Sequence, residues 1–141
     1  MSEGYLQNER PGRGRRILVV DDGAITRLLL ERTLKGEGFE VFSAKDGAHA
    51  LELMGAALPE VVVSDLEMPN LNGIELCRAM RMDSRLSSIA VILTTANEVT
   101  ETDRKSAIEA GATAFVSRTT TFQEVMSALF LALDATFQQE A

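Results

Sequence analysis

Three acidic residues directly follow short apolar runs in this sequence. Asp21 and Asp22 follow ILVV (17–20), and Asp65 follows VVVS (61–64). Carboxylate oxygens suit a hard cation such as Mg²⁺, and a carboxylate beside Mg²⁺ can act as a nucleophile in aspartyl-phosphate chemistry. Asp21 and Asp22 could instead serve only to cap the next helix, whose dipole favours negative charge there. The chemistry depends on whether the fold brings the three acids together.

Polar side chains also come at the ends of the two later apolar runs. AVILTT (90–95) ends in Thr94 and Thr95, and TAFVS (113–117) is followed by Arg118. A hydroxyl could bond an oxygen of an anion held near the acids, and the planar fork of an arginine suits a carboxylate or a phosphoryl oxygen. Threonine is also common at strand ends, and Arg118 could form an ion pair without chemistry.

Short apolar runs alternate with segments of helical period along the chain, so five β-α units are expected. The expected strands are 17–20, 40–44, 61–64, 90–95 and 113–117. The expected helices are 24–35, 47–58, 74–82, 101–110 and 121–137. Ile25, Leu28 and Leu29 fall at helical spacing in the first of these helices.

The apolar runs are continuous rather than alternating, which is typical of strands covered on both faces. We therefore expect an α/β fold, with a single doubly wound (βα)5 domain and a five-stranded parallel sheet between two helical layers. In the flavodoxin-like strand order 2-1-3-4-5, the first and third strands are neighbours and the ligand site lies beyond the carboxyl ends of the strands. The three acids would then share one shallow cup, and Arg118 would face them.

The composition fits one globular domain that is not expected to bind nucleic acid or to span a membrane. The 141 residues are 45% hydrophobic and 25% charged. The formal net charge of -7 argues against direct nucleic-acid binding, because phosphate contacts need a basic face. Cys77 is the only cysteine, and no apolar run approaches the ~18 residues of a membrane span. A cytoplasmic protein is therefore expected.

The two ends of the chain differ from its body. Residues 1–16 hold four arginines and two glutamates, with Gly and Pro and few apolar residues. We expect a flexible basic N-terminal tail at 1–15, a domain at 16–137 and a short C-terminal tail at 138–141. Nothing after the last expected helix would form a DNA-binding or catalytic output domain. We therefore expect either a stand-alone domain or a piece of a longer chain.

Four ordered motifs carry a resemblance to a known family. ILVVDDG, VVVSDLEMPNLNG, ILTTA and AGATAFVSR, at this spacing, resemble the receiver domain of bacterial response regulators over about residues 15–136. The resemblance implies a phosphoprotein of two-component signalling rather than an enzyme with a separate substrate. Asp65 would be the phosphoacceptor, taking a phosphoryl group from the phosphohistidine of a sensor histidine kinase or a histidine phosphotransfer protein.

The resemblance also implies a Mg²⁺ site around the phosphoacceptor. Asp22 would bind the metal directly, and Asp21 would act mainly through metal-bound water. Asp65 itself and the backbone carbonyl of Glu67 would be further ligands. Phosphoryl transfer needs positioning and charge stabilisation, and these groups would supply both.

Further roles follow for residues around the cup. Thr95 would be the switch hydroxyl, Phe115 the aromatic residue whose pose follows it, and Arg118 the cation at the phosphoryl group. Phe115 could equally be a core ring of the last strand. The side chains of Glu67 and Asn97 would flank the path of an attacking water and tune dephosphorylation, although both could be solvated loop residues.

Phosphorylation is expected to change the conformation of one surface, which is formed by the helix 101–110, the strand 113–117 and the helix 121–137. This surface could also pair with a second copy of the chain. The last helix carries more apolar residues than one buried stripe needs, with Leu131 on a different face from Leu129. The sequence names neither the kinase nor the output partner.

Two residues depart from the family pattern. Receivers usually carry Lys followed by Pro at the end of the fifth strand, where this chain has Arg118 and Thr119. Arginine keeps the charge but changes its reach, and the missing proline commonly imposes a cis peptide. An atypical receiver that docks partners without phosphorylation therefore stays open. So does a Mg²⁺-dependent phosphatase of the haloacid dehalogenase type, although such enzymes place a D-x-D pair after their first strand.

Overall fold

A computed structural model of the protein describes residues 14–118 and 121–140, with side chains described up to residue 134. Most of the expected N-terminal tail lies outside the described residues, as does Thr119. No helix within the described part of the chain is long and apolar enough to cross a membrane.

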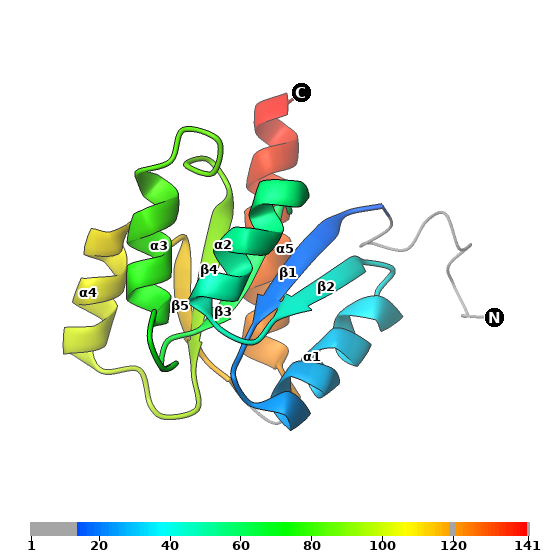
Figure 1. The fold of residues 1–141 in the computed structure, drawn as a ribbon. Helices are drawn as coiled ribbons and strands as arrows, with labels where there is room; N and C mark the ends of the chain where they lie inside the picture. Colours follow the sequence, from blue (N-terminus) through cyan, green and yellow to red (C-terminus); the bar gives the residue numbers. More distant parts are fainter. Residues whose placement is uncertain (1–13, 119–120, 141) are drawn as a thin grey trace.

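Five strands and five helices alternate along the described chain (Figure 1). The strands are β1 (Arg16–Val20), β2 (Glu40–Ala44), β3 (Val61–Asp65), β4 (Ala90–Thr95) and β5 (Ala114–Ser117). The helices are α1 (Ala24–Gly36), α2 (Gly47–Ala56), α3 (Gly73–Arg81), α4 (Glu101–Ala110) and α5 (Gln123–Glu140). All strand pairs are parallel and the sheet order is β2-β1-β3-β4-β5, which confirms the expected flavodoxin-like fold.

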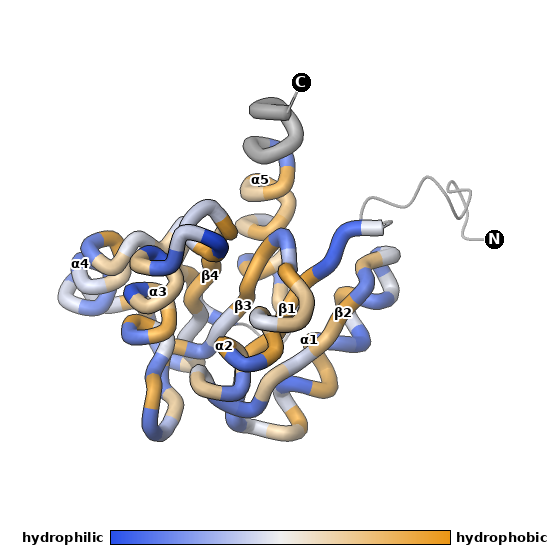
Figure 2. The backbone as a smooth tube through the Cα atoms, turned by 45° about the horizontal axis from the view of Figure 1, so that its top comes forward, coloured by the Kyte–Doolittle hydropathy of each residue, from blue (hydrophilic) through white to orange (hydrophobic). Residues whose placement is uncertain are grey.

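Two apolar cores flank the sheet because alternate strand residues point to opposite faces. On one face, Leu18 and Val62 pack with the buried residues of α2, α3 and α4. On the other face, Val19 and Val63 pack with α1 and α5. The tube of Figure 2 is hydrophobic along much of β1, β3 and β4, where both faces are covered. The site-bearing strands therefore lie in the rigid centre of the molecule.

The loop after β3 is held by the start of α3. The Asn72 side chain accepts from the Glu75 amide at 2.9 Å, and the Glu75 carboxylate accepts from the Asn72 amide at 2.9 Å, which completes a capping box. A Cβ added at Gly73 would lie 2.5 Å from the backbone oxygen of Asp65. Only glycine fits here without a shift of the backbone that carries Asp65.

Several helix bounds differ from the expected ones by one to three residues. The last helix begins at Gln123 rather than 121, because Phe122 adopts a left-handed backbone with φ 57°, which interrupts the helical path. The second helix ends at Ala56 rather than 58. In α1 the helical spacing of Ile25 and its neighbours indicates the helix correctly, but Ile25 is 75% exposed while Leu34 is buried.

Candidate functional site

The three acids of the expected cup come together at the carboxyl ends of β1 and β3. Asp21 follows β1, Asp65 ends β3, and these two strands are paired. One carboxylate oxygen from each of Asp21, Asp22 and Asp65 lies within 4.8 Å of the others. Asp21 and Asp65 are buried, whereas Asp22 is exposed. The site is therefore a cup with two buried acids and one acid at its rim.

Hydrogen bonds to the backbone fix the β1 side of the cup. The Asp21 carboxylate accepts from the Gly23 amide at 2.8 Å, which folds the chain into a tight turn before α1. From the first turns of α1, Arg27 donates to the Asp21 carbonyl at 2.7 Å. Arg27 thus restrains the loop that carries Asp21 and Asp22, and sequence reasoning missed this contact. An arginine within two helical turns of the acids is the only signal of it in the sequence.

Arg118 reaches the cup from the end of β5, as expected from the strand order. Its Nη1 atom lies 3.4 Å from an Asp21 oxygen and 3.4 Å from an Asp65 oxygen. Its backbone amide donates to the Thr95 carbonyl at 2.7 Å, which anchors the residue to the end of β4. The guanidinium therefore bridges the two buried carboxylates, as a planar donor with several N–H groups can.

Burial and mutual repulsion make the buried acids hard to ionise. Desolvation by burial, followed by the charge of Asp21, raises the pKa of Asp65 to about 6, although Arg118 and the Glu67 amide oppose the rise. Burial also raises the pKa of Asp21, against the Gly23 hydrogen bond and Arg118. One bridging arginine does not offset this desolvation, so an added cation would stabilise both carboxylates.

The donor atoms of the cup fit a hard divalent cation. Three carboxylates at the ends of β1 and β3 offer oxygen ligands only, and Asp22 is open to water, which suits Mg²⁺ because this ion keeps several water ligands. Glu67, expected to contribute its carbonyl, is exposed beside the cup, and its amide donates to Asp65 at 3.4 Å. Asp22 and Glu67 also line one open hollow that runs toward α3 and α4.

The expected switch hydroxyl lies next to the cup at the end of β4. Thr95 is buried, and its neighbour Thr94 pairs in register with Asp65. The Thr95 hydroxyl oxygen accepts from the Asn97 amide at 3.2 Å. Asn97 itself is exposed, as the interpretation of a rim residue requires. Its carbonyl accepts from the Ser117 hydroxyl at 3.2 Å, a contact that sequence reasoning missed.

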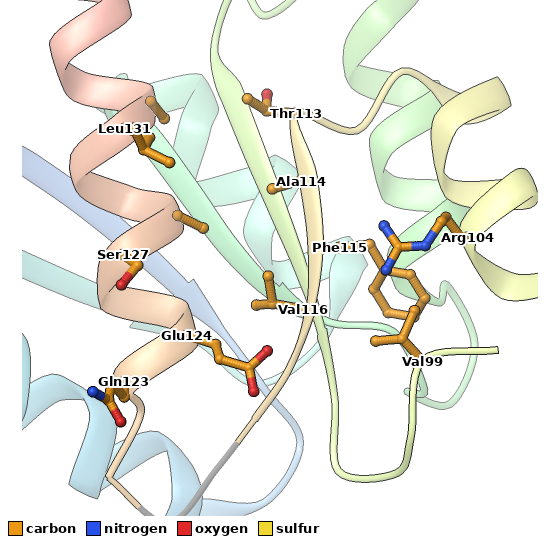
Figure 3. A pocket seen from close by; sticks show the side chains of 12 residues that line it. Val99, Arg104, Thr113, Ala114, Phe115, Val116, Gln123, Glu124, Ser127 and Leu131 are labelled. Atoms are coloured by element: carbon orange, nitrogen blue, oxygen red, sulfur yellow. The ribbon is translucent and has the colours of Figure 1, made fainter. Parts of the chain in front are cut away.

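Phe115 lies under the surface formed by α4, β5 and α5. It is 6% exposed and belongs to the core on the α4 face of the sheet. Figure 3 shows its ring beside Arg104 and Val99. These three residues line a groove of about 820 Å³. Leu131 lines the opposite wall and is 71% exposed. The aromatic ring is therefore in an inward pose beside an open groove.

The strand order and the acids at its switch point define a flavodoxin-like α/β domain with an acidic cup. The sequence model of the response regulator receiver domain matches residues 17–130. The chain belongs to this family of two-component signal transduction domains.

Several relatives show how far the likeness extends. The chain is 35% identical over 112 residues to the response regulator MprA of Mycolicibacterium vanbaalenii, covering 79% of this chain and 47% of that protein. It is 38% identical over 103 residues to the response regulator PleD of Caulobacter vibrioides, covering 73% of this chain and 22% of that protein. The chain thus spans about half, or less, of the length of these relatives.

Solved structures share the fold over most of the chain. The chemotaxis protein CheY4 of Vibrio cholerae is 28% identical, with a TM-score of 0.77. The superposition covers 82% of this chain and 95% of CheY4. The signal receiver domain of the response regulator NarL from Mycobacterium tuberculosis is 31% identical, with a TM-score of 0.73, covering 85% of this chain and 97% of that one.

Proposed function

We propose that the protein is a phosphoacceptor receiver in which Asp65 takes a phosphoryl group from a partner phosphohistidine. The observation that carries this proposal is the gathering of three carboxylates within 4.8 Å at the strand ends, with Asp65 as the acid that ends the central strand β3. Arg118 contacts one Asp65 oxygen at 3.4 Å and supplies a fixed positive charge. The domain would comprise residues 16–137, between the two expected tails.

The residues of the cup would each have a stated part in the transfer. Asp22, Asp65 and the Glu67 carbonyl would hold Mg²⁺, with Asp21 acting through water, and the bound ion would neutralise charge on the phosphoryl oxygens. An ionised oxygen of Asp65 attacks the phosphorus, the P–N bond to the histidine breaks, and the imidazole leaves with the bonding electrons. Arg118 would stabilise the resulting acyl phosphate.

Phosphorylation would then change the surface formed by α4, β5 and α5. The Thr95 hydroxyl, buried beside Asp65, would turn toward the phosphoryl group, and Phe115 would follow it. Glu67 and Asn97, both exposed at the rim, would tune the access of water to the acyl phosphate. No turnover of a separate substrate is part of this proposal.

The test uses acetyl phosphate as a small phosphodonor. Incubation of the protein with Mg²⁺ and acetyl phosphate should add the mass of one phosphoryl group, and Asp65→Asn should gain none. The same mixture with EDTA in place of Mg²⁺ should leave the mass unchanged. An unmodified wild-type mass, or a phosphorylated Asp65→Asn variant, would contradict the proposal.

Partner binding can be assigned to two exposed apolar surfaces. α1 begins directly after the acid cup and exposes Ile25, Leu28 and Leu29, so a histidine kinase or phosphotransfer protein would contact this helix while it presents its phosphohistidine. The groove beside Leu131 would serve the output partner or a second copy of the chain. A receiver that docks partners without phosphorylation is the second candidate, and Arg118 in place of the usual lysine is the observation that favours it.

A further inference from the structure

The backbone of Asn97 is held at both ends by two hydroxyl groups. Its amide donates to the Thr95 hydroxyl oxygen at 3.2 Å, and its carbonyl accepts from the Ser117 hydroxyl at 3.2 Å. Thr95 ends β4 and Ser117 ends β5, and the two residues are paired across these strands. The first turn of the loop between β4 and α4 is therefore tied to the neighbouring strand.

The hydroxyl groups of Thr95 and Ser117 would have opposite effects when Asp65 is phosphorylated. Thr95 is the residue whose hydroxyl would turn toward a phosphoryl group on Asp65. The Asn97 amide would then lose its part-buried bond to the Thr95 oxygen, and the net loss of one hydrogen bond disfavours that turn. As long as the Ser117 hydroxyl holds the Asn97 carbonyl, the loop stays where that amide faces Thr95.

We propose that Ser117 is a positioning residue that latches the loop between β4 and α4 in its resting conformation and so opposes the turn of the Thr95 hydroxyl. This inference rests on the proposed function, because it concerns the response of the same site to phosphorylation. Ser117 does not contact Asp65 in this arrangement; it acts through the backbone of Asn97.

The position of Ser117 at the end of β5 lets its hydroxyl contact the Asn97 carbonyl. The next residue, Arg118, donates its amide to the Thr95 carbonyl at 2.7 Å, which fixes the backbone that follows Ser117. Ser117 is half-buried, and its short side chain has a single rotor that directs its hydroxyl to the Asn97 carbonyl. Alanine at this position would remove the bond while filling almost the same volume.

The test compares Ser117→Ala with Ser117→Thr, which keeps the hydroxyl, and with Ser127→Ala, which removes an exposed hydroxyl on α5. Thermal unfolding of each variant checks that it folds. In the unphosphorylated proteins, amide hydrogen exchange at Asn97, followed by NMR, should accelerate in Ser117→Ala by roughly 2- to 10-fold, as the loss of one hydrogen bond implies. Ser117→Thr and Ser127→Ala should exchange as the wild type does.

The second measurement is the rate of phosphorylation by acetyl phosphate with Mg²⁺, followed by intact mass. Ser117→Ala should be phosphorylated roughly 2- to 10-fold faster than the wild type, because its resting loop is less stabilised. Unchanged exchange at Asn97, or faster exchange with an unchanged phosphorylation rate, would overturn the latch. A wild type that gains no phosphate would instead refute the proposed function, so the two failures are distinguishable.

Discussion

Replacement of Asp65 by asparagine should stabilise the protein, although Asp65 is the proposed centre of its function. In the metal-free protein, burial and the charge of Asp21 raise the pKa of Asp65 from 3.8 to about 6. The ionised form is therefore disfavoured by folding, even with Arg118 at 3.4 Å. Asparagine keeps the shape of the side chain and an accepting oxygen but carries no charge.

The size and the sign of the effect follow from this pKa. The folded state binds the Asp65 proton more tightly than the unfolded state, so the stability that the protonated group contributes is present below about pH 4. That stability is lost as the pH rises through about 6, the folded pKa. A shift of about two units at about 1.4 kcal/mol each gives a cost of about 3 kcal/mol above pH 7. Because asparagine pairs less well with Arg118, we expect Asp65→Asn to gain about 1–3 kcal/mol there.

Urea unfolding in EDTA at pH 7.5 and at pH 4 measures this difference. At pH 7.5 the midpoint of Asp65→Asn should lie on the order of 1 M urea above that of the wild type, with an unchanged slope. At pH 4 the two midpoints should converge. Asp134→Asn, which removes an exposed carboxylate on α5, should shift neither midpoint. A gain of equal size at both pH values, or a less stable Asp65→Asn at pH 7.5, would refute the electrostatic reasoning.

Three further changes test other contacts of the site. Arg118→Gln should bind Mg²⁺ several-fold more tightly than the wild type in calorimetric titration, since the guanidinium competes for oxygens of Asp21 and Asp65. Weaker binding would show instead that the arginine holds the acids in place for the metal. Gly73→Ala should lower the free energy of unfolding by about 1–3 kcal/mol, because its Cβ would lie 2.5 Å from the Asp65 carbonyl; urea unfolding beside Gly55→Ala, which meets nothing within 4 Å, checks this. Leu131→Glu should abolish any phosphorylation-dependent change in sedimentation, and identical behaviour of free and phosphorylated wild type would remove self-association through this helix.

The sequence predicts the cup well because its position depends on strand ends. A continuous apolar run that stops at an acid marks where a buried strand meets solvent, so Asp21 and Asp65 could be placed from the pattern alone. Their closeness then requires only that β1 and β3 are neighbours, which the strand order provides. Arg118 could be placed at the cup for the same reason.

Features that depend on side-chain direction, on a local backbone conformation or on the exact alignment of strand ends could not be predicted from the sequence. Ile25 has the spacing of a core residue in α1, yet the helix buries Leu30 and Leu34 toward the sheet. The left-handed backbone of Phe122, with φ 57°, has no signal in its residue type, because such a conformation is expected of glycine or asparagine. The bond between Ser117 and Asn97 likewise depends on how two strand ends are aligned, to within about one hydrogen-bond length.

The raised pKa of Asp65 and its proposed role have the same physical origin. A carboxylate that is buried beside Asp21 gains more from a cation than an exposed one does, so a metal bound in the cup would offset the cost of its charge. Arg118 offsets only part of that cost, because one Nη1 atom at 3.4 Å serves both acids. If Arg118 offset the whole cost, the acids would gain little from a bound cation. The incomplete pairing of the acids therefore supports the proposed role of the cup as a Mg²⁺ site.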